Sequence, residues 1–85
     1  MMRTATIASS VGLHARPASV FVQAVAASGA AVTLSADGRS VNAASILGVL
    51  SLGLGAGAAV TLESDDSAAL DALVELLETD LDGAS

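Results

Sequence analysis

Two long stretches of this chain, residues 17–36 and 40–62, contain no charged side chain, and only Asp37-Gly38-Arg39 separates them. Each stretch reaches the roughly 20 residues that an α-helix needs to cross a bilayer. The second also contains Gly53 and Gly57 at the four-residue spacing found where membrane helices pair. A membrane hairpin of two helices is therefore one fold open to this chain, and a water-soluble domain with an aliphatic core is the other.

The segment between the two stretches favours the soluble domain. Asp37-Gly38 suits a type I′ turn, in which both central residues have positive φ. A two-residue loop would pair Leu34 with Val41 and place both side chains on one face of a β-hairpin over residues 31–42. The hydrophobic period also changes within each stretch, unlike that of a uniformly apolar helix. We therefore expect no membrane insertion.

The remaining elements follow from periodicity and from helix start and stop signals. Residues 2–8 and 58–63 alternate like strands. Residues 15–29 indicate a helix with Pro17 in its first turn and Gly29 as its stop, and residues 45–52 a short helix that Ser45 can cap. The order βαββαβα, with too few strands to cover both sheet faces, predicts one α+β domain over residues 1–85 with its helices on one face. Pattern alone does not separate this open-faced sandwich from a ferredoxin-like fold.

The last helix has the clearest pattern and is predicted over residues 64–83. Its apolar stripe consists of Leu70, Leu73, Val74, Leu77 and Leu81. The opposite side is predicted to be a solvated acidic face formed by Asp71, Glu75, Glu78 and Asp82.

Charge and composition exclude several classes of function. Nine acidic residues, three arginines and no lysine give a net charge of −6, which argues against nucleic acid or an anionic membrane surface as a partner. The absence of cysteine removes disulfides and thiolate metal sites and fits a cytoplasmic protein. The sequence Gly53-Leu-Gly-Ala-Gly-Ala58 matches a dinucleotide fingerprint only superficially, because its glycines follow a predicted helix instead of a strand.

The only histidine, His14, lies where the chain enters its first predicted helix. The unpaired N–H groups of a helix start attract anions, and Arg16 adds planar donors that match phosphate oxygens. Gly12 allows a bend that presents the ring to solvent. Neutral imidazole is nucleophilic near neutral pH, so this site can accept and donate a phosphoryl group. With no carboxylate cluster for magnesium and no phosphate-binding loop, we expect no metal or cofactor and a dependence on partner enzymes.

Two motifs carry a family resemblance: "GLHARPAS" at residues 12–19 and "SILGVLSLG" at residues 45–53. Together they resemble the HPr family, the histidine-containing phosphocarriers of the bacterial phosphoenolpyruvate-dependent sugar phosphotransferase system, over about residues 3–80. The resemblance implies a four-stranded antiparallel sheet with three helices on one face. It also implies that His14 Nδ1 takes phosphate from enzyme I and passes it to the A domain of an enzyme II, with Arg16 stabilising the phosphoryl group. The phosphate would lie against the helix start, at Gly12, Ala15, Pro17 and Ala18.

The short helix carries the residues expected to meet partners. Residues 46–52 are too apolar for all of them to be buried, and the resemblance implies that Leu47 and Leu50, with Ile46, dock enzyme I and enzyme II. Ser45 matches the serine that an ATP-dependent kinase, the HPr kinase/phosphorylase, phosphorylates in many Gram-positive members. A regulatory adaptor of the same fold, signalling through Ser45 or serving a nitrogen-related branch, is the alternative function. We expect a monomer.

The sequence departs from the family at two places. Val11 stands where relatives often carry a polar residue that helps cap the helix or bind the phosphate. Gln23 and Ala26 replace basic residues that some members place along the first helix. Docking should therefore depend less on charge and more on the apolar residues of the short helix.

Overall fold

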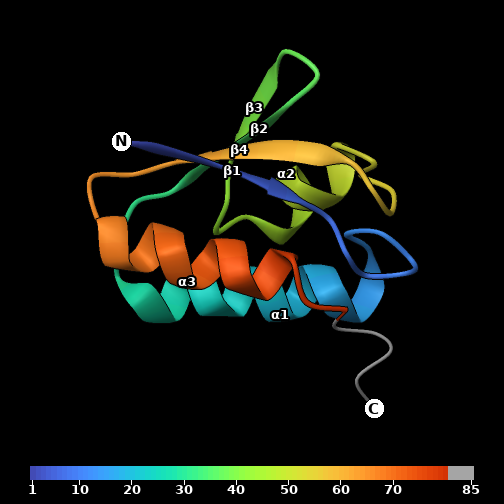
Figure 1. The fold of residues 1–85 in the computed structure, drawn as a ribbon, viewed down its shortest axis with the longest axis horizontal. Helices are drawn as coiled ribbons and strands as arrows, with labels where there is room; N and C mark the ends of the chain where they lie inside the picture. The colour runs from blue at the N-terminus through green and yellow to red at the C-terminus, as the bar shows by residue number, and fades with distance from the viewer. Residues whose placement is uncertain (81–85) are drawn as a thin grey trace.

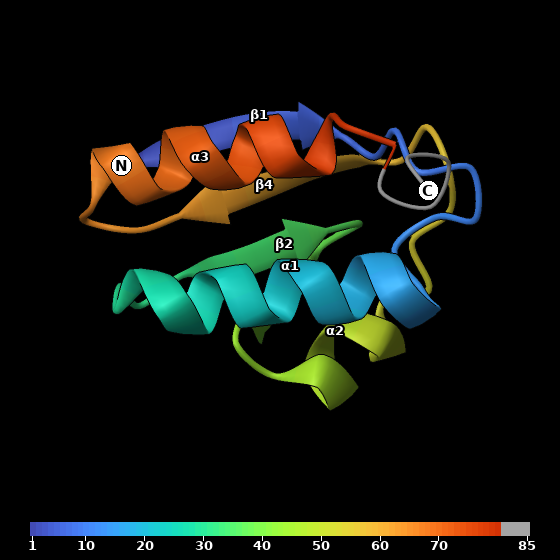
Figure 2. The same ribbon diagram turned by 90° about the horizontal axis from the view of Figure 1, so that it is seen from below.

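The computed structural model describes residues 1–80 of the chain, in which one antiparallel sheet packs against three helices (Figure 1). Its strands lie in the order β1-β4-β2-β3. The helices lie on one side of the sheet, with α1 and α3 side by side (Figure 2). The open-faced α+β sandwich and the βαββαβα order are therefore confirmed, and the elements are β1 (Met2–Thr6), α1 (Ala15–Ser28), β2 (Thr33–Ala36), β3 (Arg39–Asn42), α2 (Ile46–Ser51), β4 (Ala59–Glu63) and α3 (Ser67–Leu77).

The β2–β3 hairpin has the predicted register and turn. Leu34 pairs with Val41, and Ala36 pairs with Arg39. The central residues of the turn, Asp37 and Gly38, have φ values of 51° and 76°, so both lie in the left-handed region that a type I′ turn requires. The turn chemistry and the alternating pattern therefore specify the same register.

The core lies between the sheet and the helices and is almost wholly aliphatic. Leu34 and Leu62 from neighbouring strands are fully buried, as is Phe21 from α1. The described part of α3 contributes Leu70, Leu73 and Leu77 of its predicted stripe, while Val74 is half-buried at its margin. Each fully buried side chain of this size contributes about 1.5–3 kcal/mol, so a small chain with one aromatic residue can still fold around such a core.

Two elements are shorter than predicted. Strand β1 ends at Thr6. The Ile7 N–H still donates to the Ala58 carbonyl beside β4, but the Ala8 N–H leaves the sheet and donates to the Leu77 carbonyl at the end of α3. Helix α3 ends at Leu77, where Glu78 leaves helical geometry. The predicted positions Leu81 and Asp82 lie outside the described residues.

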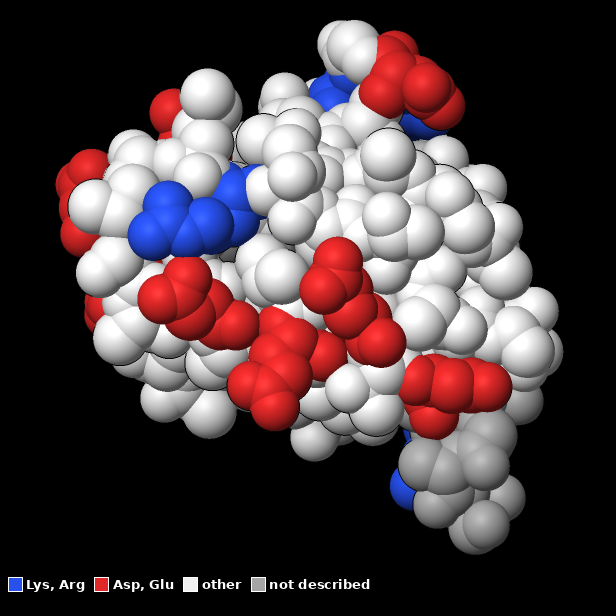
Figure 3. All heavy atoms as spheres, in the orientation of Figure 1, with Lys and Arg blue, Asp and Glu red and all other residues white. Residues whose placement is uncertain are grey.

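The solvent side of α3 is acidic, as expected (Figure 3). Asp71 forms an ion pair with Arg3 of β1 at 3.0 Å, and Glu78 accepts a hydrogen bond from the Thr6 N–H at 3.3 Å. Both contacts fasten α3 to the edge strand of the sheet.

Within residues 1–80 no helix is both long enough and apolar enough to cross a membrane. The first uncharged stretch divides into α1 and β2, and the second into β3, α2 and β4. Elements α1, β2, α2 and β4 each bury one side only, and β3 has no fully buried residue, which accounts for the changes of period along both stretches.

Candidate functional site

The loop before α1 is held tightly against the glycine-rich loop that follows α2. Gly12 has φ +74°, and a Cβ at this position would collide with the Leu54 carbonyl oxygen and lie 2.7 Å from the Gly55 Cα. The next residue, Leu13, donates its N–H to the Leu54 carbonyl at 2.9 Å and buries its side chain. Glycine is thus required at Gly12 for its backbone angle and for its lack of a side chain. This anchored loop positions His14 at the start of α1.

His14 is the N-cap residue of α1, as the sequence predicted. Its backbone is extended, with φ −129° and ψ 167°, and its side chain makes no capping hydrogen bond. The His14 carbonyl accepts the first helical bond, from the Ala18 N–H at 3.4 Å. Pro17 is buried and has no N–H to satisfy. The N–H groups of Ala15 and Arg16 have no partner within residues 1–80, so the helix start can receive an anion.

Ala15 has a backbone conformation that sequence reasoning missed. Its φ of 47° lies in the left-handed region, which costs an L-residue such as alanine about 1–2 kcal/mol. Asparagine or glycine would have signalled this conformation, whereas alanine gives no signal. Strained backbone of this kind is concentrated at functional sites. The exposed Ala15 lies directly between His14 and Arg16.

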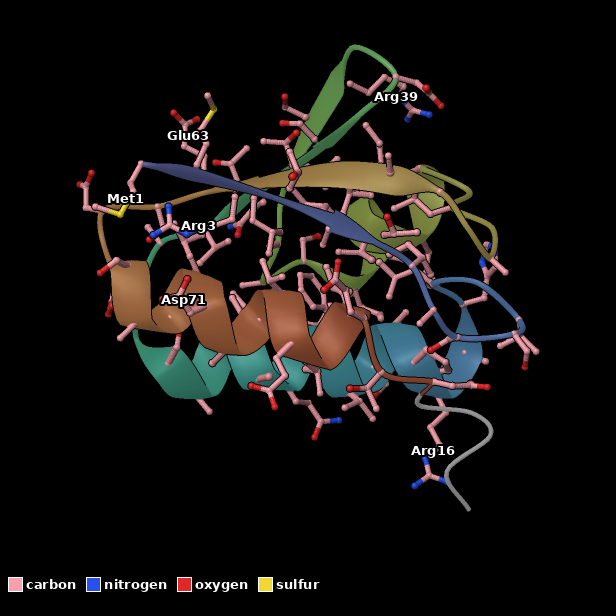
Figure 4. All side chains as sticks on the ribbon, in the orientation of Figure 1. Met1, Arg3, Arg16, Arg39, Glu63 and Asp71 are labelled. Carbon is pink, nitrogen blue, oxygen red and sulfur yellow. The ribbon has the colours of Figure 1, made fainter. Side chains whose placement is uncertain are left out.

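Arg16 is the one arginine of this chain that makes no hydrogen bond or ion pair within residues 1–80. Arg3 is bound to Asp71, and Arg39 donates to the Ser51 carbonyl. The Arg16 side chain is exposed and projects from the first turn of α1 away from the sheet (Figure 4). No acidic residue lies in that first turn. The start of α1 therefore carries a guanidinium and the positive end of the helix dipole in a chain of net charge −6.

The described part of the site offers no metal centre. Among residues 1–80 no three side chains of His, Asp or Glu gather closely enough to hold a metal ion.

Helix α2 lies beside the N-terminal half of α1 (Figures 1 and 2). Its N-cap is Ser45, whose hydroxyl accepts a hydrogen bond from the Gly48 N–H at 3.1 Å. Val49 is fully buried, while Leu47 is 79% exposed. Exposed apolar side chains therefore gather next to the His14 end of the molecule, and we call Ile46, Leu47 and Leu50 the α2 patch.

Val11, which departs from the family pattern, lies in the loop before α1. Its side chain is largely exposed on the turn before Gly12. A hydrocarbon side chain cannot supply the polar contact that some relatives have at this position, so the start of α1 receives no cap from Val11.

Fold and site together define a class: small open-faced α+β sandwiches that present one histidine at the start of a helix. A family model described as the PTS HPr component phosphorylation site matches residues 1–79. The chain therefore belongs to the HPr family, the phosphocarrier proteins of the phosphotransferase system.

Individual relatives agree with this assignment. The chain is 51% identical to the phosphocarrier protein HPr of Streptomyces coelicolor over 73 residues, which cover 85% of this chain and 78% of the relative. The crystal structure of HPr-C-His from Thermoanaerobacter tengcongensis superposes with a TM-score of 0.91 at 38% identity, covering 100% of this chain and 98% of that one. An HPr dimer from the same organism gives a TM-score of 0.70 at 43% identity, covering 79% and 80%.

Proposed function

We propose that this chain accepts a phosphoryl group on His14 from phosphorylated enzyme I and donates it to the A domain of a sugar-specific enzyme II. The observation that carries the proposal is the uncapped start of α1, where His14 is the N-cap residue and the N–H groups of Ala15 and Arg16 have no partner within residues 1–80. The protein is a cytoplasmic carrier in this proposal, and its partners supply the catalysis.

The transfer chemistry requires one tautomer of His14. With its proton on Nε2, the neutral ring has a lone pair at Nδ1 that attacks the phosphorus atom. A bond between Nδ1 and phosphorus forms as the bond from phosphorus to enzyme I breaks, and the electron pair of that bond stays with enzyme I. Donation to enzyme II is the same exchange, with this chain as the leaving partner. Arg16 and the first-turn N–H groups stabilise the negative phosphate oxygens during both steps.

Phosphoryl labelling tests this proposal directly. Radioactive phosphoenolpyruvate with catalytic enzyme I should place acid-labile label on the wild-type chain and none on His14→Ala. Circular dichroism and thermal unfolding must first confirm that the two proteins are equally folded. No label on either protein, with an enzyme I competent on its own carrier, would contradict the proposal and leave the regulatory adaptor as the better function.

The α2 patch is proposed to dock both partners. Its best probe is Leu47, because a side chain that is 79% exposed contributes little to the fold. Leu47→Asp should raise the concentration of carrier needed for half-maximal transfer about tenfold or more, as expected for a central apolar contact. Met2→Asp is the matched control, since Met2 is also an exposed apolar residue but lies on β1. Equal effects of the two substitutions would contradict the assignment.

Ser45 is proposed as a regulatory phosphorylation site for an HPr kinase/phosphorylase. Its hydroxyl stands at the N-cap of α2, next to the α2 patch, and a phosphate there would add negative charge at the docking surface. Incubating the chain with such a kinase and ATP should label the wild type but not Ser45→Ala. Label on both proteins would place the modified residue elsewhere.

A monomeric state is also proposed. Analytical ultracentrifugation of the chain at micromolar concentration should give a single species of 8.2 kDa. A species of twice that mass would overturn the proposal.

A further inference from the structure

Helix α2 is too short to hold its own shape. It contains six residues, Ile46–Ser51, and so has barely more than one turn of internal hydrogen bonds. Isolated helices of this length are not stable in water. Ser45 fastens the first turn through its bond to the Gly48 N–H, and buried Val49 fastens the middle. The last turn, which carries Leu50, is closed by the bonds from the Leu52 and Gly53 N–H groups, and β3 adds a further attachment to it.

Strand β3 supplies contacts to α2 at two points along the same side of the strand. Arg39 donates from Nη1 to the carbonyl of Ser51, the last residue of α2, at 3.1 Å. Two residues further along β3, Val41 lies so close to Gly48 that a Cβ on Gly48 would be 3.3 Å from the Val41 Cβ. Alternate residues of a strand share a face, and residues three apart share a side of a helix. The spacing of Arg39 and Val41 on one face of β3 thus matches the spacing of Ser51 and Gly48 on one side of α2.

The hairpin turn determines where Arg39 lies. Asp37-Gly38 forms the two-residue turn, so Arg39 is the first residue of β3 and its side chain starts near the tip of the hairpin (Figure 4). A long side chain is needed to reach from there to the end of α2. Arginine also suits the acceptor, because cationic donors bind the unpaired carbonyls at helix C-termini.

We propose that Arg39 is a positioning residue: by binding the Ser51 carbonyl, it fixes the last turn of α2 and thereby the orientation of the α2 patch. The functional part of this inference rests on the proposed docking role of that patch. The structural part concerns the free protein and stands independently of any partner.

Hydrogen exchange in the free protein tests the structural part. The N–H groups of Leu52 and Gly53 bond to the Val49 and Leu50 carbonyls, so their exchange reports the last turn of α2. Arg39→Ala should speed their exchange about two- to tenfold, the range expected for one lost hydrogen bond. Arg39→Lys keeps a cationic donor and should restore part of the protection. Arg3→Ala is the control, because it removes the same charge from a residue bound to Asp71 instead of α2.

Transfer from enzyme I tests the functional part. With Arg39→Ala, the KM for the carrier should rise about three- to tenfold, while kcat stays within about twofold of the wild type. Unchanged exchange at Leu52 and Gly53 overturns the inference, even if KM rises, because Arg39 would then act by touching the partner. Faster exchange in a protein whose wild type accepts no phosphoryl group supports the structural role of Arg39 and overturns the proposed function instead.

Discussion

The helices α1 and α3 both begin at an extended N-cap residue, but their N-termini differ in chemistry. The N-cap residues His14 and Asp66 are both extended, with φ values of −129° and −103°. Asp66 accepts a hydrogen bond from the Ala69 N–H at 3.0 Å, while the His14 side chain caps nothing. A capping bond of this kind is worth about 1 kcal/mol. The start of α3 is thus capped by its own N-cap side chain, whereas the start of α1 has no side-chain cap.

The charges around the two helix starts also differ. At the start of α3, Asp65 and Asp66 are consecutive and repel any further anion. At the start of α1, the first turn has no acidic residue and contains Arg16. An open helix start is an anion site only where the local charge permits it. This difference supports the proposal that the start of α1, and not that of α3, holds the phosphoryl group.

Gly12→Ala should have the largest effect, because it breaks the loop that holds the open helix start. A methyl group there meets the backbone of Leu54 and Gly55 and is also strained at φ +74°. We expect a loss of about 2–4 kcal/mol in the free energy of unfolding, measured by urea denaturation. Gly29→Ala is the control, because Gly29 has φ +72° but open space around it and should cost only about 1 kcal/mol. Equal losses would mean that the contact with the Leu54 loop is unimportant.

Ala15→Asp should reduce the difference in charge between the starts of α1 and α3. It places a carboxylate in the first turn of α1, where repulsion of roughly 1 kcal/mol per charge pair at contact distance opposes the incoming phosphate. We expect phosphoryl transfer to slow about tenfold. Ala15→Asn is the matched control, because asparagine has the same shape and tolerates the φ of 47° without adding charge. If both variants transfer at the same rate, charge at the helix start does not govern acceptance.

Local sequence signals were sufficient to predict the structure where a turn or a helix end depends only on neighbouring residues. Asp37-Gly38 specified the hairpin turn, Gly29 the end of α1, and Ser45 the cap of α2, and each is found with the expected geometry. In each case the relevant interaction spans only a few residues, so the sequence contains all of it. The position of His14 at a helix start was predictable for the same reason.

Contacts between distant segments were not predictable. The apolar period of α3 continues to Leu81, yet the helix stops at Leu77, whose carbonyl accepts the Ala8 N–H. Beyond it, the Asp80 carboxylate accepts the Ser10 N–H at 3.3 Å. These bonds join residues about 70 positions apart, which periodicity does not register. The bond from Arg39 to the end of α2 escaped prediction for the same reason.

Asp66→Ala should remove the cap that distinguishes α3 from α1. The Ala69 N–H would lose its partner, and the free energy of unfolding should fall by about 1 kcal/mol in urea denaturation. Phosphoryl transfer should not change, because the start of α3 takes no part in it. Asp66→Ser can still cap the helix and should recover most of the lost stability. A slower transfer by Asp66→Ala at full folding would show that the two helix starts are coupled.

The ion pair between Arg3 and Asp71 should contribute least, although it is the one ion pair within residues 1–80. Both side chains are substantially exposed, at 37% and 68%, so water screens the attraction and the expected coupling is only about 0.2–1 kcal/mol. A double-mutant cycle with Arg3→Ala and Asp71→Ala would measure it, and about 1 M salt should remove most of it. A coupling that survives high salt would show that hydrogen-bond geometry between α3 and β1 matters more than charge.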